Sequence, residues 1–346
     1  MNGNGKRDSL TLKDIAHLAG VSVGTASKVI NGVGNVSLER RIRVEAVIEK
    51  LGYRPSALAR SIKRRKTMVI GLIIPKIKNA FYIQIIDAIE KLVQKKGYTL
   101  FLGNSDENLS TEIGYLQTFA ALRVDGLILA SAGRIDPGKI MRELDTFKSM
   151  SIPVVSIVRQ LDGSQLDTVL LDNVQGAYEA TKHVLEMGHR RIAIISSPEH
   201  TSASRERIEG YSRALEEYKL PYTRDMIKVS EAIPESGYRI TKEIIGMRNP
   251  PTALFVASNY PLIGSLQALR DTGRTIPDDI SLICFDDPEW SPYIDPPLTA
   301  VHPNTDELCT AAVNTLMERI NGDSSGQPVS VRIPTQLIVR KSVRRM

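Results

Sequence analysis

The spacing of hydrophobic residues changes character about 66 residues into the chain. Up to that point apolar residues recur at helical spacing in three short stretches, whereas beyond it apolar runs of strand length alternate with amphipathic stretches. Such alternation predicts parallel sheets covered on both faces, and the units are too many for one compact sheet. We therefore expect two doubly wound lobes, over about 67–166 and 168–297. The expected strands are 68–74, 98–103, 126–131, 153–158, 168–171, 191–196, 252–257 and 280–285, and the expected helices are roughly 80–96, 110–123, 137–148, 173–187, 203–218, 236–246, 260–272 and 305–321.

The first sixty-odd residues predict an all-α head of three helices. Thr11 can cap the first helix, with Asp14 in its first turn, and Gly20 can end it. Ser22 can cap a second helix after a short turn, and Ser37 can cap a third. Two short helices joined by a turn of about four residues, with a third as a brace, are typical of a helix-turn-helix.

The second helix is the predicted reader of DNA. It begins with short side chains, which allow the backbone to approach the major groove closely, and Lys28 can reach guanine acceptors. The backbone N–H groups near Ser22 can hold a phosphate. A structural three-helix unit that binds protein is the alternative. The short side chains are Val23, Gly24, Thr25 and Ser27.

Charge also separates the two parts of the chain. Residues 1–66 hold 14 Lys and Arg against 5 Asp and Glu, whereas the whole chain holds 45 against 39. A basic head therefore precedes a slightly acidic body, and basic patches attract polyanions because each phosphate contact releases counterions. A solvated basic tail is the alternative, but the helical patterning of the head argues against it.

A specific family resemblance begins at the first helix. The N-terminal signature of the lactose/galactose repressor (LacI/GalR) family closely resembles TLKDIAHLAGVSVGTASKVINGVGNVS and RVEAVIEKLGYRPSALARSI. The family's body is similar, at the same intervals, to TMVIGLIIP, RVDGLILAS, GHRRIAIIS, RIEGYSRALEE, PTALFVAS and IPDDISLICFDD. The resemblance runs from about Leu10 to Arg340. It implies a helix-turn-helix head on a body of two doubly wound parallel-sheet lobes, like that of periplasmic binding proteins.

The resemblance also implies how the chain is divided. In the family the chain crosses between the lobes three times, and the helix expected at 305–321 returns to the first lobe. The strand expected in SVRIPTQLIVRKS follows this helix. The expected parts are a disordered tail (1–9), the helix-turn-helix (10–53), a hinge helix and linker (54–66) and the body (67–346), with lobe one gaining about 300–325 and lobe two gaining 328–346.

The segment after the third helix is a predicted hinge. Pro55 blocks continuation of the third helix, and Ser56 can cap a new one. A helix of about eight residues is marginal alone in water, so it should fold when a partner supplies contacts. Small residues such as Ala59 permit two hinge helices to pack closely, and the family's minor-groove wedge, usually leucine, maps to Ile62. A plain basic linker is the alternative.

Candidate ligand contacts lie at the carboxyl ends of the expected strands, where open α/β sheets bind ligands. Phe81 and Tyr82 can stack on a ring, with local packing as the alternative. The family often has arginine at the position of Arg159 and places ligand contacts at positions matching Arg207 and Asp286. Such an Arg and Asp can jointly hydrogen-bond adjacent hydroxyls, and a salt bridge within lobe two is the alternative.

Departures from the family pattern bear on the ligand. Ser258-Asn259 stands where Asn-Asp is common, and Val158 stands where sugar-binding members often carry an acid. Thr201 and Ala203 replace an arginine and a threonine of a purine-binding member. The resemblance therefore disfavours a purine and favours a sugar or sugar derivative.

Other classes of protein fit the sequence poorly. Two cysteines, Cys284 and Cys309, cannot make a disulfide framework, so we expect a reducing, cytoplasmic setting. No apolar run is long enough to span a membrane, and the N-terminus lacks an export signal. The five histidines show no metal-binding spacing, and no nucleotide or nucleophile motif appears, so we expect neither an enzyme nor a cofactor or metal. A solute-binding protein or a sugar-processing enzyme with a basic head is the alternative.

These patterns predict a sequence-specific transcription regulator, a repressor controlled by a small molecule held between the lobes. One small head buries little DNA, so we expect a homodimer on a pseudo-palindromic double-stranded operator. The candidate DNA contacts are Thr11, Ser22, Val23, Gly24, Thr25, Ser27, Lys28, Asn31, Ser37, Tyr53, Ala59 and Ile62, and the candidate effector contacts are Phe81, Tyr82, Arg159, Arg207, Asn259 and Asp286.

Overall fold

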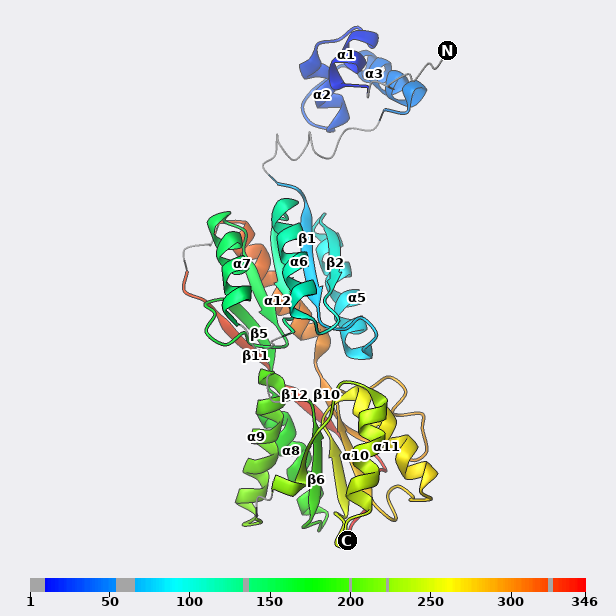
Figure 1. Cartoon of the computed structure of the whole chain (residues 1–346). Helices are drawn as coiled ribbons and strands as arrows, with labels where there is room; N and C mark the ends of the chain where they lie inside the picture. The colour runs from blue at the N-terminus through cyan, green and yellow to red at the C-terminus, as the bar shows by residue number, and fades with distance from the viewer. Residues whose placement is uncertain (1–9, 54–65, 133–136, 199–200, 222–223, 323–325) are drawn as a thin grey trace, which may run out of the picture. The chain divides into compact units, whose positions relative to one another are not determined.

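The chain forms two compact units, a helical head that ends at Thr67 and an α/β body that begins at Met68 (Figure 1). The computed structural model describes residues 10–53, 66–132, 137–198, 201–221, 224–322 and 326–346. None of the helices within these ranges is both long and apolar enough to cross a membrane.

The head consists of three helices around a small core, as the sequence predicts, with side-chain caps at Thr11 and Ser22 but not at Ser37. Gly20 has a φ of 62°, and its N–H bonds to the His17 carbonyl at 3.1 Å, which ends the first helix and turns the chain toward the second. The helices are α1 (Leu12–Leu18), α2 (Val23–Ile30) and α3 (Leu38–Leu51), and the buried core residues are Ile15, Ala19, Val29 and Val44.

Lobe one of the body is a parallel six-stranded sheet in the order β11-β5-β4-β3-β1-β2. Neighbouring residues of one strand serve opposite faces: Leu72 packs with α5 and α12, whereas Ile73 packs with α6 and α7. The elements are β1 (Val69–Ile74), α5 (Ala80–Lys95), β2 (Thr99–Asn104), α6 (Leu109–Ala121), β3 (Gly126–Leu129), α7 (Pro137–Ser149), β4 (Val154–Ile157), β5 (Asp167–Leu171), α12 (Thr305–Ile320) and β11 (Ser330–Ile333).

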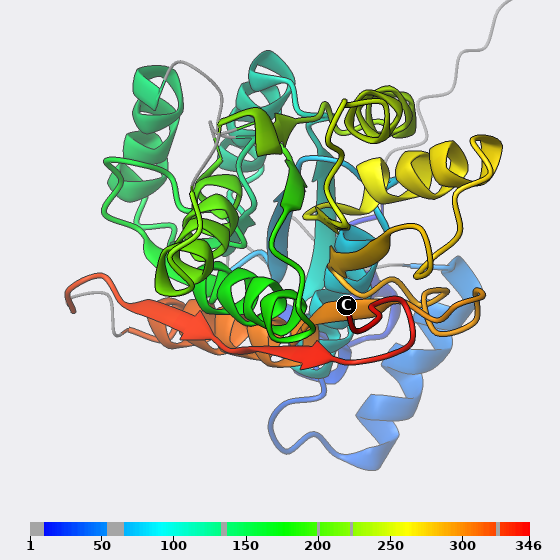
Figure 2. The ribbon, with the colours of Figure 1, turned by 90° about the horizontal axis from the view of Figure 1, so that it is seen from below.

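Lobe two is a second six-stranded sheet, in the order β12-β10-β9-β8-β6-β7, with only β10 and β12 antiparallel. Helices cover both faces (Figure 2): Phe255 packs with α8 and α9, and Val256 packs with α10 and α11. The elements are α8 (Asn173–Glu186), β6 (Ile192–Ser196), α9 (Ser202–Glu217), the 3-10 turn η1 (Arg224–Met226), β7 (Ile227–Val229), α10 (Pro234–Ile245), β8 (Ala253–Val256), α11 (Asn259–Asp271), β9 (Ser281–Phe285), β10 (Thr299–Pro303) and β12 (Thr335–Ile338).

The boundaries between the lobes differ from the predicted ones at three crossings. β5, expected to open lobe two at 168, pairs with β4 and belongs to lobe one. β10, expected in lobe one from 300, pairs with β9 in lobe two, and the chain returns to lobe one with α12. The strand expected in SVRIPTQLIVRKS divides at Pro334 into β11 in lobe one and β12 in lobe two. The sequence pattern predicts that a segment is a strand, whereas the choice of sheet depends on which strand edge is open to it.

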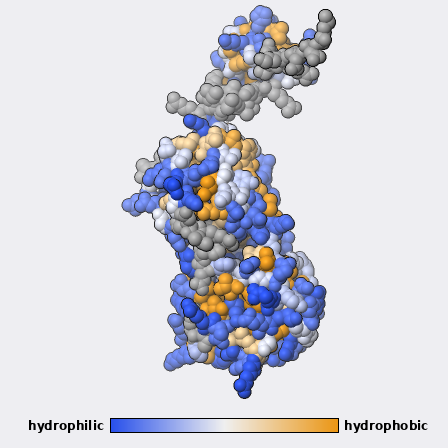
Figure 3. Space-filling view, in the orientation of Figure 1, coloured by the Kyte–Doolittle hydropathy of each residue, from blue (hydrophilic) through white to orange (hydrophobic). Residues whose placement is uncertain are grey.

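Elsewhere the expected strands and helices agree with the observed ones within two residues. The apolar pattern does not predict β7, because none of its three residues is fully buried. Cys284 in β9 and Cys309 in α12 are buried free thiols. The face of the body seen in Figure 3 is largely hydrophilic, with scattered hydrophobic patches.

Candidate functional site

The exposed side of the head is organised by the caps of α1 and α2. The Asp14 carboxylate accepts hydrogen bonds from the backbone N–H and the hydroxyl of Thr11, at 2.8 and 2.7 Å. Ser22 Oγ accepts a bond from the Thr25 N–H at 3.1 Å and lies 2.9 Å from the Thr25 hydroxyl. These bonds fix the start of α2 and leave Val23 exposed in its first turn.

The side chains of Lys28 and Asn31 differ in how firmly the head holds them. Lys28 is exposed, and its Cδ lies 3.4 Å from where a Cβ at Gly34 would stand, so its stem runs along the loop after α2. Gly34 has a φ of 77°, which favours glycine at this contact. Asn31 donates to the Ser27 carbonyl at 2.6 Å and to the Ser27 hydroxyl at 3.2 Å, which ties it to the end of α2.

The remaining head candidates lie at the periphery of this surface. Ser37 is exposed at the start of α3, and its side chain makes no capping bond. Tyr53 is half-buried and packs against the head core. Ala59 and Ile62, and the predicted hinge with them, lie outside the described residues.

Substitution of Ser22 with alanine is expected to loosen α2 by about 1 kcal/mol, because the Thr25 N–H loses its acceptor. Hydrogen exchange of the α2 amides in the full-length chain measures this change. Ser37→Ala is the matched control, since the Ser37 hydroxyl makes no cap bond and α3 should keep its protection. Equal loosening by both variants would contradict a capping role for Ser22.

In lobe two, a buried polar cluster stands at the carboxyl ends of β8 and β9. Arg207 on α9 donates to Asp286 Oδ1 at 3.0 Å, to the Ala257 carbonyl at 2.7 Å and to Asn173 Oδ1 at 3.0 Å. Its guanidinium lies 3.7 Å from the centre of the Phe285 ring. The salt bridge that the sequence left as an alternative is therefore present, and both of its residues are at most 8% exposed.

In lobe one, a matching cluster stands at the carboxyl ends of β2, β3 and β4. Arg159 donates to the two Glu107 carboxylate oxygens at 3.0 and 2.8 Å, and to the Ser131 carbonyl at 3.2 Å. Glu112 accepts from the Ser131 hydroxyl at 2.7 Å, and burial raises the pKa of Glu112. Burial also raises the pKa of Tyr82 to about 12, so its hydroxyl stays protonated.

The aromatic pair at the start of α5 is packed into lobe one. The Phe81 and Tyr82 rings are 5.4 Å apart in an edge-to-face arrangement, and both belong to the core of lobe one. Their exposed fractions are 5% and 3%. The rings of Phe81 and Tyr82 are therefore packed locally in this structure, which is the alternative that the sequence left open for stacking.

Backbone strain lies next to both arginine–carboxylate pairs. Val158, directly before Arg159, has a φ of 68°, and Asp286 also has a φ of 68°. Left-handed backbone is unfavourable for both residue types and for a β-branched valine in particular, and such strain collects at functional sites. Asp287 next in the chain is structural, because both of its carboxylate oxygens accept from Arg340, at 2.7 and 2.9 Å.

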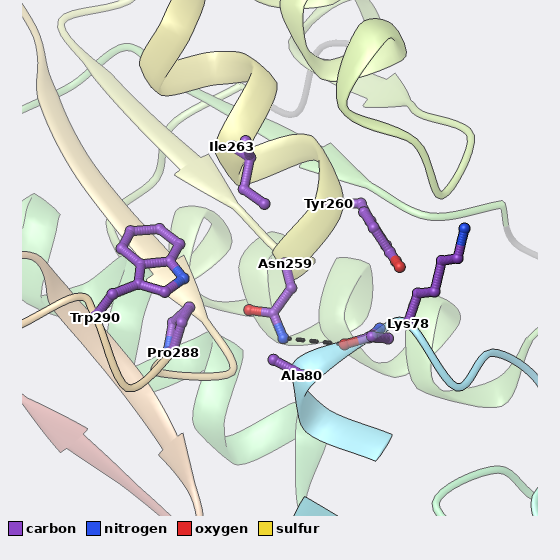
Figure 4. A pocket seen from close by; sticks show the side chains of 8 residues that line it. Lys78, Ala80, Asn259, Tyr260, Ile263, Pro288 and Trp290 are labelled. Atoms are coloured by element: carbon purple, nitrogen blue, oxygen red, sulfur yellow. Dashed lines mark hydrogen bonds between the residues drawn. The ribbon is translucent and has the colours of Figure 1, made fainter. Parts of the chain in front are cut away.

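The two clusters lie on edges of the sheets that face each other. The Gln160 N–H of lobe one bonds to the Ser202 hydroxyl of lobe two at 2.8 Å, and Asn259 Nδ2 donates to Asn79 Oδ1 at 3.3 Å. Arg205 pairs with Asp162 across the same boundary at 2.8 Å. A hollow opens beside the Asn259–Asn79 contact (Figure 4). It is lined by Lys78, Asn79, Ala80, Asn259, Tyr260, Ile263, Pro288 and Trp290.

Sequence reasoning missed several members of this site. Glu107 is 52 residues from Arg159, and Asn173 is 34 residues from Arg207, so their pairing is decided by sheet order. The one feature of the sequence that could have identified Glu107 is its position just after a predicted strand. Trp290 also carried a signal, because it is the single tryptophan of the chain and follows Asp286 by four residues.

Known proteins are similar to both units. Residues 11–56 match the model of bacterial regulatory proteins of the lacI family, and residues 181–343 match the periplasmic binding protein-like domain. The repressor PurR of Escherichia coli, an HTH-type transcriptional repressor, is 35% identical over 333 residues, which cover 96% of each chain. PurR of Shigella dysenteriae gives the same values.

Solved structures agree with this result. The transcriptional regulator CelR in its cellobiose complex has a TM-score of 0.72 at 29% identity, and the match covers 96% of this chain and 99% of that one. The Lac repressor dimer bound to operator and the anti-inducer ONPF has a TM-score of 0.86 over 97% of this chain and 100% of that one; its 23% identity shows the shared fold alone.

The helix-turn-helix head and the two-lobed body together define a DNA-binding transcription regulator, and not an enzyme. The chain belongs to the lacI family of bacterial regulatory proteins. The family resemblance and the fold class predicted from the sequence are thereby confirmed.

Proposed function

We propose that this regulator is a homodimeric repressor that reads a pseudo-palindromic operator and responds to a sugar or sugar derivative held between its lobes. The observation that carries the effector site is the Arg207–Asp286 pair, buried at the carboxyl edge of lobe two. The Arg159–Glu107 pair occupies the corresponding edge of lobe one. We place the regulator in the cytoplasm, where its DNA target lies.

The chemistry of the two clusters supports a hydroxyl-rich ligand. The guanidinium of Arg207 donates, the carboxylate of Asp286 accepts, and the neutral hydroxyl of Tyr82 can do both, so adjacent hydroxyls would find complementary partners. Two similar regulators favour the same class: CelR was solved with cellobiose, and a LacI-family regulator from Enterococcus faecium, 28% identical with a TM-score of 0.70 over 80% of this chain and 99% of that one, was solved with ribose.

The head supports the DNA side of the proposal. The exposed face of α2 presents Val23 and Gly24 in its first turn and Lys28 in its last, which suit close approach to a major groove. The candidates Thr11, Ser22, Thr25 and Ser37 would then serve phosphates and the helix caps. Two copies related by a dyad double the contacts of one small head, so a pseudo-palindromic target follows.

Coupling between the two sites would pass through the angle between the lobes. The chain crosses between them three times, and an effector that prefers one lobe angle shifts the population toward it. The same linkage describes effector-driven release and effector-driven binding, with opposite signs of one coupling free energy.

Two measurements test the proposal. A thermal-shift screen of the full-length chain against sugars, sugar acids, phosphorylated sugars and nucleosides should find a sugar that raises the melting temperature. Selection from random duplexes should then return one pseudo-palindrome, whose affinity the same sugar changes. Equal, salt-sensitive binding to every duplex, with no response to any compound, would contradict the proposal.

Substitution of Lys28 with alanine is expected to relax base preference at one operator position, at a cost of about 1–3 kcal/mol there. The reason is that its ammonium, carried on an exposed stem beside Gly34, is the longest donor on the exposed face of α2. Binding to a set of operators with single base changes measures the effect. An unchanged base profile with uniformly weaker binding would make Lys28 a phosphate contact instead.

A further inference from the structure

We infer that the hollow between Trp290 and Tyr260 is an aromatic subsite, adjoining the Arg207–Asp286 pair, that takes a neutral, hydroxyl-bearing ring. The effector would then be an elongated glycoside, with one unit at Arg207 and Asp286 and a second ring in the hollow. This inference rests on the proposed effector site and specifies the class of ligand that the site accepts.

The walls of the hollow suit the flat face of a sugar ring. Trp290 and Tyr260 stand on opposite sides of Asn259 (Figure 4), and Pro288 and Ile263 add apolar surface. Trp290 is half-buried and packs against the core of lobe two, which holds the indole in place. Aromatic faces and apolar side chains bind rings, whereas a few polar groups orient them.

Asn259 supplies the polar group. It is 7% exposed, and its Nδ2 donates to Asn79 of lobe one, which leaves its Oδ1 without a hydrogen-bond partner among the described residues. The hydroxyl of Tyr260 is likewise unpartnered within the described part of the chain. Buried polar atoms are normally hydrogen-bonded. Two unpartnered atoms beside one hollow therefore indicate that a ligand supplies the missing bonds, including a donor to Asn259 Oδ1. In Figure 4 the Asn259 oxygen is turned toward Pro288 and Trp290.

The hollow adjoins the polar cluster along two segments of chain. The Ala257 carbonyl accepts from Arg207, and Asn259 follows Ala257 by two residues. Asp286 pairs with Arg207, and Pro288 follows it by two residues. Because two residues span at most about 7 Å, one ligand can contact the cluster and the hollow together.

The charges of the site favour a neutral ligand. Arg207 is paired with Asp286, and Arg159 is paired with Glu107, so each guanidinium already has its carboxylate. Among the residues that line the hollow, only Lys78 is charged. An anionic group placed at either arginine would have to displace a buried carboxylate, which is unfavourable. Two lysines lie at the hollow itself: the exposed Lys78 lines it, and Lys76 Nζ lies 5.5 Å from the centre of the Tyr260 ring. The preference for a neutral ligand therefore rests on the two paired arginines.

Trp290 makes the subsite directly observable, since it is the single tryptophan of the chain. Emission of the full-length protein should be titrated with cellobiose, maltose and lactose, with methyl glucoside as the one-ring control. Gluconate and glucose 6-phosphate are the charged comparators. We expect at least one disaccharide to change the emission saturably, and the one-ring control to leave it unchanged.

Variants separate stacking from packing. Trp290→Leu keeps an apolar side chain against the core of lobe two but removes the ring face, so affinity for the active disaccharide should fall about tenfold. Trp290→Phe should retain most of it. Affinity for a one-ring ligand, measured by calorimetry, should change less than twofold in either variant.

The outcomes distinguish this inference from the proposed function. A compound that raises the melting temperature and changes operator affinity, while Trp290 emission and the Leu variant show no effect, overturns the subsite and leaves the function standing. Emission that no disaccharide changes, or that only the charged compounds change, also overturns it. A disaccharide that changes emission and loses affinity in the Leu variant, yet leaves operator binding unchanged, supports the subsite and contradicts its role in regulation.

Discussion

Removal of residues 1–66 is expected to abolish operator binding and to leave effector binding intact. The body from Met68 onward is a separate compact unit that contains both sheets and both polar clusters. The removed part carries the excess of positive charge and the whole helix-turn-helix, so both specific and nonspecific DNA affinity should disappear. The loss at the operator should be at least about 10³-fold.

Fluorescence anisotropy with the selected operator and a thermal-shift titration with the effector measure the two activities in parallel. The full-length chain at raised salt is the control, because it weakens phosphate contacts without removing the head. If the truncated protein loses effector binding as well, the two activities are not modular, and the division of labour proposed for head and body fails.

Substitution of Asp286 with asparagine is expected to remove the effector response while effector-free operator binding persists. Asp286 accepts from Arg207 at 3.0 Å and is 8% exposed, so the amide preserves shape but removes the charge that orients the guanidinium. A charged hydrogen bond contributes roughly 1.5–3 kcal/mol, so effector affinity should fall about 10- to 100-fold. The thermal stability should fall as well, since Arg207 stays buried with its charge unpaired.

Asp287→Asn is the matched control for this experiment. Asp287 is the next residue, but its carboxylate pairs with Arg340. It precedes Trp290 by three residues. Its substitution should lower the melting temperature and still permit the effector to shift it. A normal effector response in the Asp286 variant, or equal loss in both variants, would show that the pocket is misplaced.

The head was readable from the sequence because its signals are local. Thr11 and Ser22 cap helices whose ends lie within a few residues, and Gly20 ends α1 through its own positive φ. Such interactions join residues three or four apart, so the linear order of the chain contains them. The strands and helices of the body were equally accessible, because a buried strand and an amphipathic helix each carry their own period.

The site was only partly readable, for a reason visible in Arg159 and Arg207. Both were selected from their position after a strand or at a family position, but their partners Glu107 and Asn173 come from other strand ends and were not. Phe81, selected as a stacking ring, is packed into the core of lobe one, since a side chain at the start of α5 can face either the cleft or the sheet.

By itself the sequence determined most of the helices and strands, where the basic reading head lies, and to which family the chain belongs. Only the tertiary structure decided which sheet receives β5, β10 and β11, which carboxylate neutralises each arginine, and that Trp290 and Asn259 share one hollow. The physical reason is range. Caps and hydrophobic periods act over a few residues, whereas strand pairing and buried ion pairs join residues tens of positions apart, and their choice depends on every other segment that competes for the same edge or charge.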